Sequence, residues 1–502
     1  MKEKFVFSLI TGLSSNVLFL FASYILLLKL DIASIGIWVF LNTVVNLGFL
    51  FINIGFDSIH YQYSGKENIS DYIGTYFMIK VVLLIINIII TLGLLAILQI
   101  WNTVFIAFSL LLLVSKIFFC IGNIFIVNLR IKIKIFKAEI PNFFVITGNS
   151  LSIIYLAFNI SHISDPILYL SVSNFIFYTF FVIIIFYLSK NEIKINKPNK
   201  LLARNYIKDA KPLIFFSIVS VIATYLGNLI LYYSFGSEPL GYFSSVNTYL
   251  IPVLLLISGS ISSIYLILFS QDFEREDFNS IKTTLYVIEN YSSILFLSII
   301  IIILLNGELI ISIFLPNFLE AVPILYIMIF IPYFIAISQP YSWLLVAGKK
   351  QKINARVNSF VSILIIILML YFIPQELFFF QTLGLGVIGY ALAQTIPWIF
   401  WTFLCRYYIN KTLNIKYQIT MILQFFLAVL TIIITFFIKN FLNSIFLENQ
   451  TLLLILSSII AMGIFIGFLI IFKELKREDL SFFIEILKLK SYTESAKKEF
   501  TS

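Results

Sequence analysis

The amino-acid sequence predicts an all-α integral membrane protein with fourteen transmembrane helices. Hydrophobic residues make up 60% of the 502 residues and charged residues only 12%, and the mean hydropathy is +1.02. A chain of this composition has too little polar surface for a soluble protein of its length. Apolar runs of about 20 residues, the length that spans a bilayer, follow one another along the chain. A short motif that occurs twice indicates that the bundle arose by duplication.

The repeated motif consists of a glycine, an aromatic residue, an asparagine and a threonine at identical offsets. Its members are Gly36, Trp38, Asn42 and Thr43 in the first copy and Gly241, Phe243, Asn247 and Thr248 in the second. Each copy follows a short polar turn and begins a long apolar helix. We therefore expect two equivalent helical hairpins, related by a pseudo-two-fold axis.

The transmembrane helices are assigned to apolar runs in chain order. The first run is longer than the apolar part of a signal peptide, so we keep it as a spanning helix. The predicted spans are residues 5–28, 35–56, 72–98, 101–127, 141–160, 166–188, 212–234, 241–269, 285–305, 321–347, 353–373, 384–408, 418–438 and 451–472.

The positions of the basic residues support this assignment. Of the 34 Lys and Arg residues, 30 lie at the termini or in connections on the same side as the termini. Only Lys29 and Lys439 lie on the other side, and Lys80 and Lys116 lie inside spans. By the positive-inside rule, both termini are cytoplasmic in a multi-pass protein of the cytoplasmic membrane. The net charge of +9 is explained in this way and does not indicate a nucleic-acid partner.

The longest cytoplasmic connection separates six spans from the eight that follow. We expect an N-terminal six-helix lobe at residues 1–188, a cytoplasmic linker at 189–211, a C-terminal six-helix lobe at 212–409, two additional helices at 410–472 and a cytoplasmic amphipathic tail at 473–502.

Two cytoplasmic segments have amphipathic patterns. In the linker, apolar residues between positions 201 and 207 stand among lysines. This pattern fits either a short helix on an anionic lipid surface or a solvated linker. In the tail, apolar residues at helical spacing over 480–487 predict an interfacial helix.

Polar residues inside the spans indicate which helix faces avoid lipid. They gather on one face of the second span (Asn42, Asn46, Asn53, Asp57), the third (Lys80, Asn87, Thr91), the fourth (Asn102, Ser109, Lys116, Asn123), the seventh (Ser217, Thr224, Asn228) and the eighth (Asn247, Ser258). We expect these faces to line a hydrated cavity, and interhelical hydrogen bonding is the alternative. The candidate substrate-binding residues are Lys116, Lys80, Asn42, Asn46, Asn53, Asp57, Asn228 and Asn247.

The two lysines inside spans differ in depth. Lys80 lies about 12 Å from its cytoplasmic end by helical rise and could extend to the interface. Lys116 lies about 20 Å from either end of its helix, and a cation there costs on the order of 3 kcal/mol to insert. It would suit an anionic ligand such as a diphosphate. The alternative is a structural ion pair with Asp57 or Glu289, although Glu289 is expected near the cytoplasmic interface.

No cofactor or metal site is expected from the sequence. His60 and His162 lie near helix ends on opposite sides of the membrane, and no Cys/His cluster occurs. Cys120 and Cys405 lie in apolar helices and are interpreted as packing residues. The glycines of residues 384–389 fit a dinucleotide fingerprint, but they begin a span and follow no strand, so we expect close helix packing.

With these features the chain resembles the O-antigen type polysaccharide flippases, a family of the multidrug/oligosaccharidyl-lipid/polysaccharide (MOP) exporter superfamily. The resemblance covers residues 5–472. It rests on the order and lengths of the spans, the repeated hairpin, Asn53-Ile-Gly-Phe, Ala347-Gly-Lys-Lys and Gly384-Leu-Gly-Val-Ile-Gly-Tyr-Ala. It implies a MATE-like fold with two six-helix lobes around a central cavity lined by the first, second, seventh and eighth spans.

The resemblance also implies a function. The protein would move a polyprenyl-diphosphate-linked oligosaccharide outward by alternating access, for cell-surface polysaccharide biosynthesis. Its partners would be this substrate and membrane lipids, with glycan-assembly enzymes as candidate partners, and a monomer is expected. Arg356 and Arg406 lie near the cytoplasmic ends of their predicted spans and are counted with the cytoplasmic connections. The sequence is therefore interpreted as having no arginine inside a span, unlike some relatives, so a cationic cavity would depend on Lys80 and Lys116.

Two other functions are weighed against the flippase. A drug/cation antiporter of the same superfamily would bind cations at membrane carboxylates, for which Asp57 is the strong candidate in the second span. A membrane polymerase or ligase of lipid-linked glycans would need a sizeable outer loop for its catalytic residues. The outer loops are expected to be short, the longest at about 306–320, so we do not expect an enzyme.

Overall fold

The computed structural model describes most of the chain. The described residues are 2–52, 54–63, 69–98, 103–132, 134–256, 269, 272–273, 275–377, 380–415, 420–445 and 449–475. The predicted tail helix at 480–487 lies outside them.

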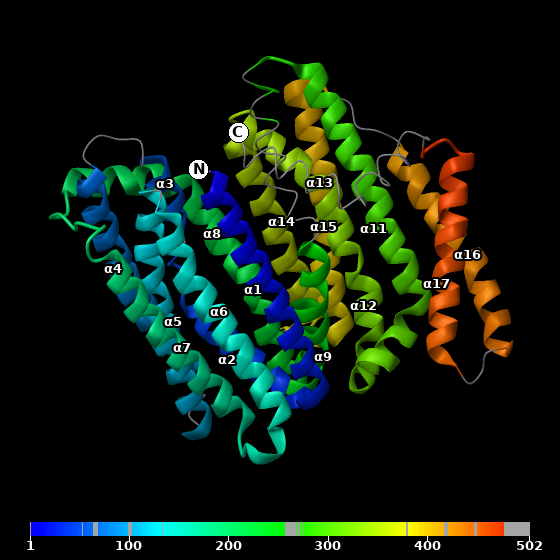
Figure 1. The fold of residues 1–502 in the computed structure, drawn as a ribbon, viewed down its shortest axis with the longest axis horizontal. Helices are drawn as coiled ribbons and strands as arrows, with labels where there is room; N and C mark the ends of the chain where they lie inside the picture. Colours follow the sequence, from blue (N-terminus) through cyan, green and yellow to red (C-terminus); the bar gives the residue numbers. More distant parts are fainter. Residues whose placement is uncertain are drawn as a thin grey trace.

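Six long helices and one short helix form the first lobe, which lies at the left of Figure 1. They are α1 (Lys2–Lys29), α2 (Ile32–Gly48), the short α3 (Phe56–Gln62), α4 (Ile69–Ile97), α5 (Thr103–Ile131), α6 (Ile135–Phe158) and α7 (Pro166–Ser189), with a 3-10 turn η2 (Ile160–His162) between the last two. The helix α1 packs against α6, and α7 packs against both α5 and α6.

The second lobe repeats this arrangement. It contains α8 (Lys200–Phe235), α9 (Ser237–Ser244) with the π-helical segment η3 (Ser245–Leu250), α11 (Phe278–Phe314), the 3-10 segment η4 (Pro316–Ala321), α12 (Val322–Met328), α13 (Phe330–Ala347), α14 (Gln351–Phe372) and α15 (Gly386–Leu413). The helix α8 packs against α14 as α1 packs against α6, and α15 packs against α13 and α14 as α7 packs against α5 and α6. A β-hairpin, β1 (Glu376–Leu377) and β2 (Phe380–Gln381), connects α14 to α15.

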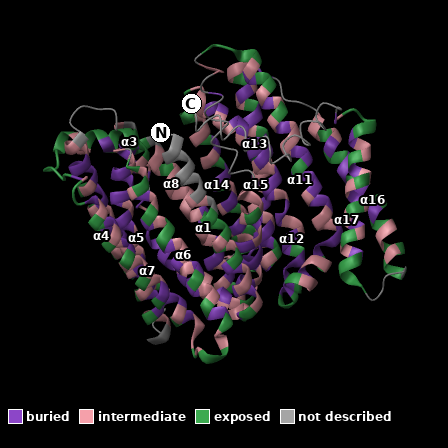
Figure 2. Ribbon diagram, in the orientation of Figure 1, coloured by how far each residue is buried: buried purple, intermediate pink, exposed green. Residues whose placement is uncertain are grey.

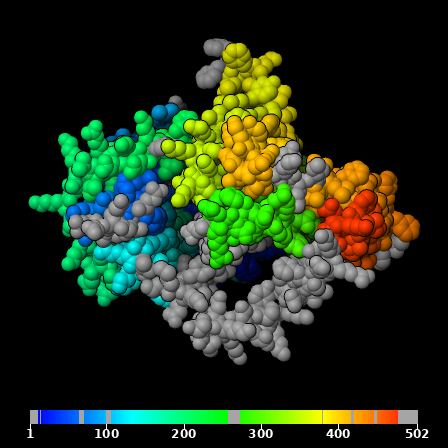
Figure 3. Space-filling model, turned by 90° about the horizontal axis from the view of Figure 1, so that it is seen from above, coloured from blue at the N-terminus to red at the C-terminus, as the bar shows by residue number. Residues whose placement is uncertain are grey.

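Two more helices, α16 (Thr420–Ile445) and α17 (Gln450–Ile471), pack on α11 of the second lobe. Seen from above in Figure 3, they lie at the end of the molecule opposite the first lobe. Large apolar side chains remain exposed on the peripheral helices, including Ile85 and Ile89 on α4, Phe437 on α16 and Ile459 on α17. Figure 2 shows exposed residues along these helices at both ends of the molecule. Such a surface is suited to contact with lipid.

Twelve helices in the described part of the chain are long and apolar enough to cross a membrane, and residues 14–29 and 32–48 form two shorter apolar helices. Each predicted span overlaps one of these fourteen segments. The all-α membrane fold is therefore confirmed. The number of fourteen spans stays a prediction, because the apolar segments found in α1 and α2, residues 14–29 and 32–48, are shorter than a usual spanning helix.

The linker differs from both alternatives expected for residues 201–207. These residues belong to α8, which begins at Lys200 and continues without a break into the membrane region. Asn199 caps the helix, because its side chain accepts hydrogen bonds from the backbone of Leu201 and Leu202. Tyr206 is fully buried against α3 rather than facing lipid or solvent. Neither a separate surface helix nor a solvated linker describes this segment.

The repeated motif forms a close contact between the lobes. A Cβ atom on Gly36 would lie 1.8 Å from the backbone oxygen of Ser237, and one on Gly241 would lie 2.2 Å from the backbone oxygen of Ile32. Ser237 and Ile32 each precede the glycine of their own copy by four residues. The contact is therefore reciprocal, as a two-fold relation requires. The helices α2 and α9 cross here backbone to backbone, at the end of the molecule away from the N-terminus (Figure 1).

Replacing Gly36 by alanine should destabilise the protein. The added methyl group overlaps a backbone atom that cannot rotate away, so the two helices must separate, at a cost of about 1–3 kcal/mol. Thermal unfolding of the purified protein in detergent measures the loss. Gly93→Ala is the matched control, because a Cβ atom at Gly93 in α4 meets no atom within 4 Å. Equal stability of Gly36→Ala and the wild type would show that α2 and α9 do not cross in this way.

Candidate functional site: a polar cavity between the lobes

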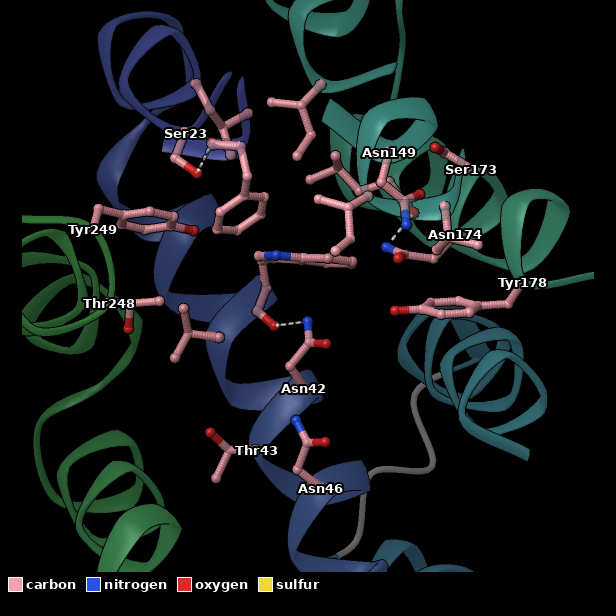
Figure 4. A pocket seen from close by; sticks show the side chains of 18 of the residues that line it. Ser23, Asn42, Thr43, Asn46, Asn149, Ser173, Asn174, Tyr178, Thr248 and Tyr249 are labelled. Carbon is pink, nitrogen blue, oxygen red and sulfur yellow. Dashed lines mark hydrogen bonds between the residues drawn. The ribbon is translucent and has the colours of Figure 1, made fainter. Parts of the chain in front are cut away.

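A cavity of about 400 Å³ lies between the inner helices of the first lobe and two segments of the second. Its polar lining residues are Ser23 on α1, Asn42, Thr43 and Asn46 on α2, Asn149 on α6, Ser173, Asn174 and Tyr178 on α7, Tyr225 and Asn228 on α8, and Thr248 and Tyr249 at η3. Figure 4 shows ten of these side chains around the same space. Its apolar lining residues include Trp38. We call this space the first-lobe cavity.

Three of the candidate residues line this cavity, and a fourth contacts its wall. Asn42 and Asn46 lie one turn apart on α2 and both face the space. The Asn42 side chain also donates a hydrogen bond to the backbone oxygen of Trp38, at 2.8 Å. Lys116 on α5 donates to Asn46 Oδ1 at 2.7 Å, and its ammonium lies 5.2 Å from the centre of the Phe119 ring. No ion pair involves Lys116 in the part of the chain that the structure describes.

Asn228, the third lining candidate, connects the two lobes. Its side-chain nitrogen donates to Thr43 Oγ1 of α2, and its oxygen accepts from the Tyr390 hydroxyl of α15, both at 2.9 Å. Both ends of the amide are thus engaged, and the side chain is 8% exposed. The role of Asn228 is to hold α8 against α2, so the alternative of interhelical hydrogen bonding describes it better than ligand binding.

Asn247 lies outside this cavity. It lines a smaller cavity of about 240 Å³ inside the second lobe, with Ser220, Thr224, Asn358 and Gln394 among the other polar lining residues. The adjacent residue, Thr248, faces the first-lobe cavity instead. We call the smaller space the second-lobe cavity.

Several lining residues were not among the candidates from the sequence. Asn149, Asn174 and Tyr178 belong to α6 and α7, for which no polar face was predicted from the sequence. Asparagines inside apolar spans were nevertheless a usable signal, because an amide in hydrocarbon needs a partner or water.

The polar face of the second span is interrupted. The helix α2 ends at Gly48, and Gly55 has a φ of +86°, a left-handed conformation that breaks the helix before α3 begins at Phe56. Asp57 therefore does not continue the face of Asn42 and Asn46, and it is not among the residues that line the first-lobe cavity. Asn53 lies outside the described residues.

The polar residues of α4 form hydrogen bonds with backbone groups that this break leaves without helical partners. Asn87 Oδ1 accepts a hydrogen bond from the backbone nitrogen of Phe51 at 2.9 Å, and Lys80 donates to the backbone oxygen of Ile52 at 2.6 Å. Irregular backbone at membrane depth needs such partners, because lipid offers none. The face of α4 thus supports the broken end of α2, and the prediction that it lines a cavity was wrong.

Lys80 is buried rather than extended to the interface. It is 2% exposed and forms an ion pair with Asp57, which also accepts a hydrogen bond from the Tyr76 hydroxyl at 2.7 Å. The possibility of a structural ion pair between Asp57 and Lys116 is excluded by this geometry, because the carboxylate is engaged by Lys80.

A buried histidine joins this cluster to the second lobe. His60 stacks on Tyr76 with the ring centres 4.0 Å apart, and its two ring nitrogens lie 2.6 Å from the Tyr206 hydroxyl and 3.0 Å from Asn128 Oδ1. Burial lowers the pKa of His60 to about 4, although the hydrogen bond with Asn128 and the charge of Asp57 act in the opposite direction. His60 is therefore neutral at pH 7 and attaches the start of α8 to the first lobe.

The second lobe contains a further buried ion pair that corrects two expectations. Glu289 on α11 is fully buried, not at an interface, and pairs with Arg406 on α15, which is 5% exposed. Arg406 also donates to Ser338 Oγ at 3.3 Å and to the backbone oxygen of Ile337 at 3.1 Å. Arg406 lies inside a helix long enough to span, so the statement that no arginine lies inside a span was wrong.

The other sequence features have structural roles where they are described. Gly384 and Gly386 have φ values of +60° and +56°, and a Cβ atom on Gly389 would lie 2.4 Å from the backbone oxygen of Phe372. Close packing of these glycines is confirmed. Cys120 and Cys405 are buried and unpaired. Among the described residues no group of three His, Cys, Asp or Glu side chains is placed to hold a metal ion.

The fold is similar to solved structures of membrane transporters. A structure of the lipid II flippase MurJ in an inward closed conformation has 20% identity and a TM-score of 0.66, over 93% of this chain and 98% of that one. An inward-facing MATE family multidrug resistance transporter of the MOP superfamily has 12% identity and a TM-score of 0.60, over 78% and 94%. A MOP superfamily transporter from Pyrococcus furiosus has 12% identity and a TM-score of 0.53, over 81% and 95%.

These similarities define the fold class: the chain has the fold of the MOP superfamily transporters. No protein-family model matches the chain, and no curated protein sequence matches it. The polysaccharide flippase family thus stays a prediction.

Removing the carboxylate of Asp57 should destabilise the protein through Lys80. Deleting one partner of a buried ion pair costs about 3–5 kcal/mol, and we expect the lower end for Asp57→Asn because Asp57 is 24% exposed. The double variant Asp57→Asn/Lys80→Met should be more stable than Asp57→Asn, since it leaves no buried charge. Thermal unfolding of the two variants measures this coupling. Losses that simply add would show that the two side chains do not pair.

His60 should make stability depend on pH. Its pKa is lowered from 6.5 to about 4 in the folded protein, so the unfolded chain binds a proton that the folded chain does not between these values. The contribution of neutral His60 to the free energy of unfolding is fully present above pH 6.5. It falls by on the order of 3 kcal/mol as the pH drops to 4. His60→Gln should lose this component, and His162→Gln, at an exposed position, should keep it. Identical pH profiles of unfolding for all three proteins would contradict the assignment.

Proposed function

We propose that this protein is a transporter that moves a polyprenyl-diphosphate-linked oligosaccharide across the cytoplasmic membrane by alternating access, for cell-surface polysaccharide biosynthesis. The observation that carries the proposal is the position of Lys116. Its ammonium lies about 20 Å from either end of α5 by helical rise and binds Asn46, which lines the first-lobe cavity. A cation that a membrane protein keeps at this depth without a carboxylate suits an anionic substrate.

Three features support transport by this route. The cavity lies between two lobes that touch through the crossing of α2 and α9, and the fold is similar to those of flippases and multidrug transporters. Lys116 can change partners, because an amide holds it more weakly than a carboxylate would. The diphosphate would replace Asn46, and the glycan would occupy the polar cavity beside it.

The drug/cation antiporter is the second candidate, because MATE transporters have the same fold. Binding of a cationic drug requires an accessible carboxylate. No Asp or Glu is among the described residues that line the first-lobe or the second-lobe cavity, and Asp57 is engaged by Lys80. Proton-coupled dye efflux that disappears in Asp57→Asn would favour the antiporter.

A membrane polymerase or ligase has less support. The expected outer loop at 306–320 is largely helical, because α11 continues to Phe314 and η4 begins at Pro316. The similar solved structures reported above are of transporters.

Replacing Lys116 should abolish most transport of a lipid-diphosphate oligosaccharide. In proteoliposomes, transport exposes the glycan to an added, membrane-impermeant glycan-cleaving enzyme. We expect Lys116→Met to slow this exposure by about ten- to hundredfold, since a hydrogen bond to a charged group contributes about 1.5–3 kcal/mol. Lys29→Met, at an exposed residue at the end of α1, is the matched control. Transport at the full rate by Lys116→Met would overturn the role of Lys116, and no exposure by the wild type would overturn the flippase.

A further inference from the structure

The two cavities are related by the same two-fold repeat as the helices. Asn42 lines the first-lobe cavity, and Asn247, at the same place in the second copy of the motif, lines the second-lobe cavity. On the next pair of equivalent helices, Asn149 of α6 lines the first and Asn358 of α14 lines the second. A serine follows each of these two asparagines. Equivalent helices of the two lobes therefore each contribute an amide side chain to the cavity of their own lobe.

A third pair of helices repeats the correspondence. On α7, Asn174 is followed four residues later by Tyr178, and both line the first-lobe cavity. On α15, Gln394 is followed four residues later by Trp398, and both line the second-lobe cavity. Each cavity thus has an aromatic ring one helical turn from an amide. The two halves of the chain share only a few matched residues. Amide and aromatic side chains on equivalent helices would therefore not be expected to persist in both halves unless both cavities require them.

The lining of both cavities is polar but uncharged. No Asp, Glu, Lys or Arg is among the described residues that line either of them. An ionised group that entered such a space would lose its hydration without gaining a counter-charge, which is strongly unfavourable. Apart from the place of Asn46, where Lys116 supplies a counter-charge, the two cavities therefore disfavour a diphosphate and acidic sugars.

The lining suits neutral sugars. A sugar ring presents hydroxyl groups, which donate and accept hydrogen bonds, and an apolar face of C–H groups. Amide side chains also donate and accept, and aromatic rings offer an apolar surface to the C–H face. In the first-lobe cavity, the buried Oδ1 of Asn149 has no hydrogen-bond partner in the described structure. An unsatisfied buried acceptor on a cavity wall indicates a ligand that donates to it.

The two cavities are adjacent across the lobe boundary. Consecutive residues of α8, Thr224 and Tyr225, line the second-lobe and the first-lobe cavity respectively, and so do Asn247 and Thr248 of η3. Neighbouring side chains of a helix point about 100° apart, so each of these two segments faces both cavities. One oligosaccharide could therefore contact both.

We propose that the two cavities are equivalent subsites for uncharged sugar residues, so that the glycan is neutral and is held by both lobes at once. This inference rests on the proposed function and gives the chemical class of its substrate. Lys116 beside Asn46 binds the diphosphate, and the amide-lined cavities bind the sugars that follow it.

Tryptophan fluorescence tests the subsites without relying on transport, because Trp38 lines the first-lobe cavity and Trp398 the second. The purified protein is titrated with a panel of neutral di- to tetrasaccharides of hexoses and N-acetylhexosamines, and with uronic acid oligosaccharides of the same lengths. We expect a saturable change with at least one neutral oligosaccharide and none with its acidic counterpart. Asn149→Leu and Asn247→Leu, one in each cavity, should each weaken binding about tenfold, the effect of one lost hydrogen bond to a ligand. Asn358 is left unchanged because its Oδ1 accepts a hydrogen bond from Trp401 Nε1 at 2.9 Å.

Asn142→Leu is the matched control, since Asn142 is on α6 but does not line the first-lobe cavity, and it should bind as the wild type does. The comparison of neutral with acidic oligosaccharides uses the wild type alone and does not depend on the folding of a variant. No response across the neutral panel, an equal response to acidic oligosaccharides, or an effect of only one of the two asparagine variants would overturn the proposal. Binding without transport of any lipid-linked glycan would instead overturn the flippase and leave the subsites in place.

Discussion

The structure depends on the crossing of α2 and α9, where two backbones approach more closely than any side chain permits. Gly36 and Gly241 lie at this crossing. Gly36 contacts the backbone of Ser237, and Gly241 contacts the backbone of Ile32, which has the equivalent position in the first copy of the motif. Because the contact is reciprocal, the two lobes are held around one axis, and the helices that follow each glycine are placed symmetrically. The Asn42 and Asn247 side chains then point into equivalent cavities. No ion pair between α2 and α9 is found among the described residues, so no charge pair would have to be broken if these two helices separated.

A second constraint is that lipid cannot hydrogen-bond to backbone, so every break in a membrane helix must be satisfied by protein. The break between α2 and α3 frees the groups of Phe51 and Ile52, and Asn87 and Lys80 of α4 bind them. Asp57 then neutralises Lys80. Polar residues inside this bundle thus do two different things. Some complete the backbone of a neighbouring helix, and others line a cavity, and only the contacts in three dimensions distinguish them.

This distinction marks what could be predicted from the sequence. The order of the helices could be predicted from the lengths of the apolar runs and the charges of the loops. The repeated motif could be recognised from the equal spacing of its residues. Both are local patterns in the sequence. The partner of Lys80 could not be predicted, since Asp57 was assumed to continue the helical face of Asn42, whereas Gly55 breaks that helix. The pair of Glu289 and Arg406 joins helices more than 100 residues apart, and nothing in either local sequence indicates it. The asparagines of α6 and α7 were visible in the sequence, but their relation to α14 and α15 became recognisable only when the cavities were compared.

The positions of the buried charged side chains explain why the diphosphate and the glycan of the proposed substrate would bind at different places. Among the described residues, Lys80 and Arg406 are buried cations that are paired with carboxylates. Lys116 is held by an amide, so among the described residues it is the cation at this depth with no ion pair to neutralise its charge. A diphosphate would supply that neutralisation, and the uncharged cavities on either side of α8 and η3 would reject the same group. A neutral glycan attached to a diphosphate therefore satisfies both environments at once, which neither a cationic drug nor a uniformly acidic polymer does.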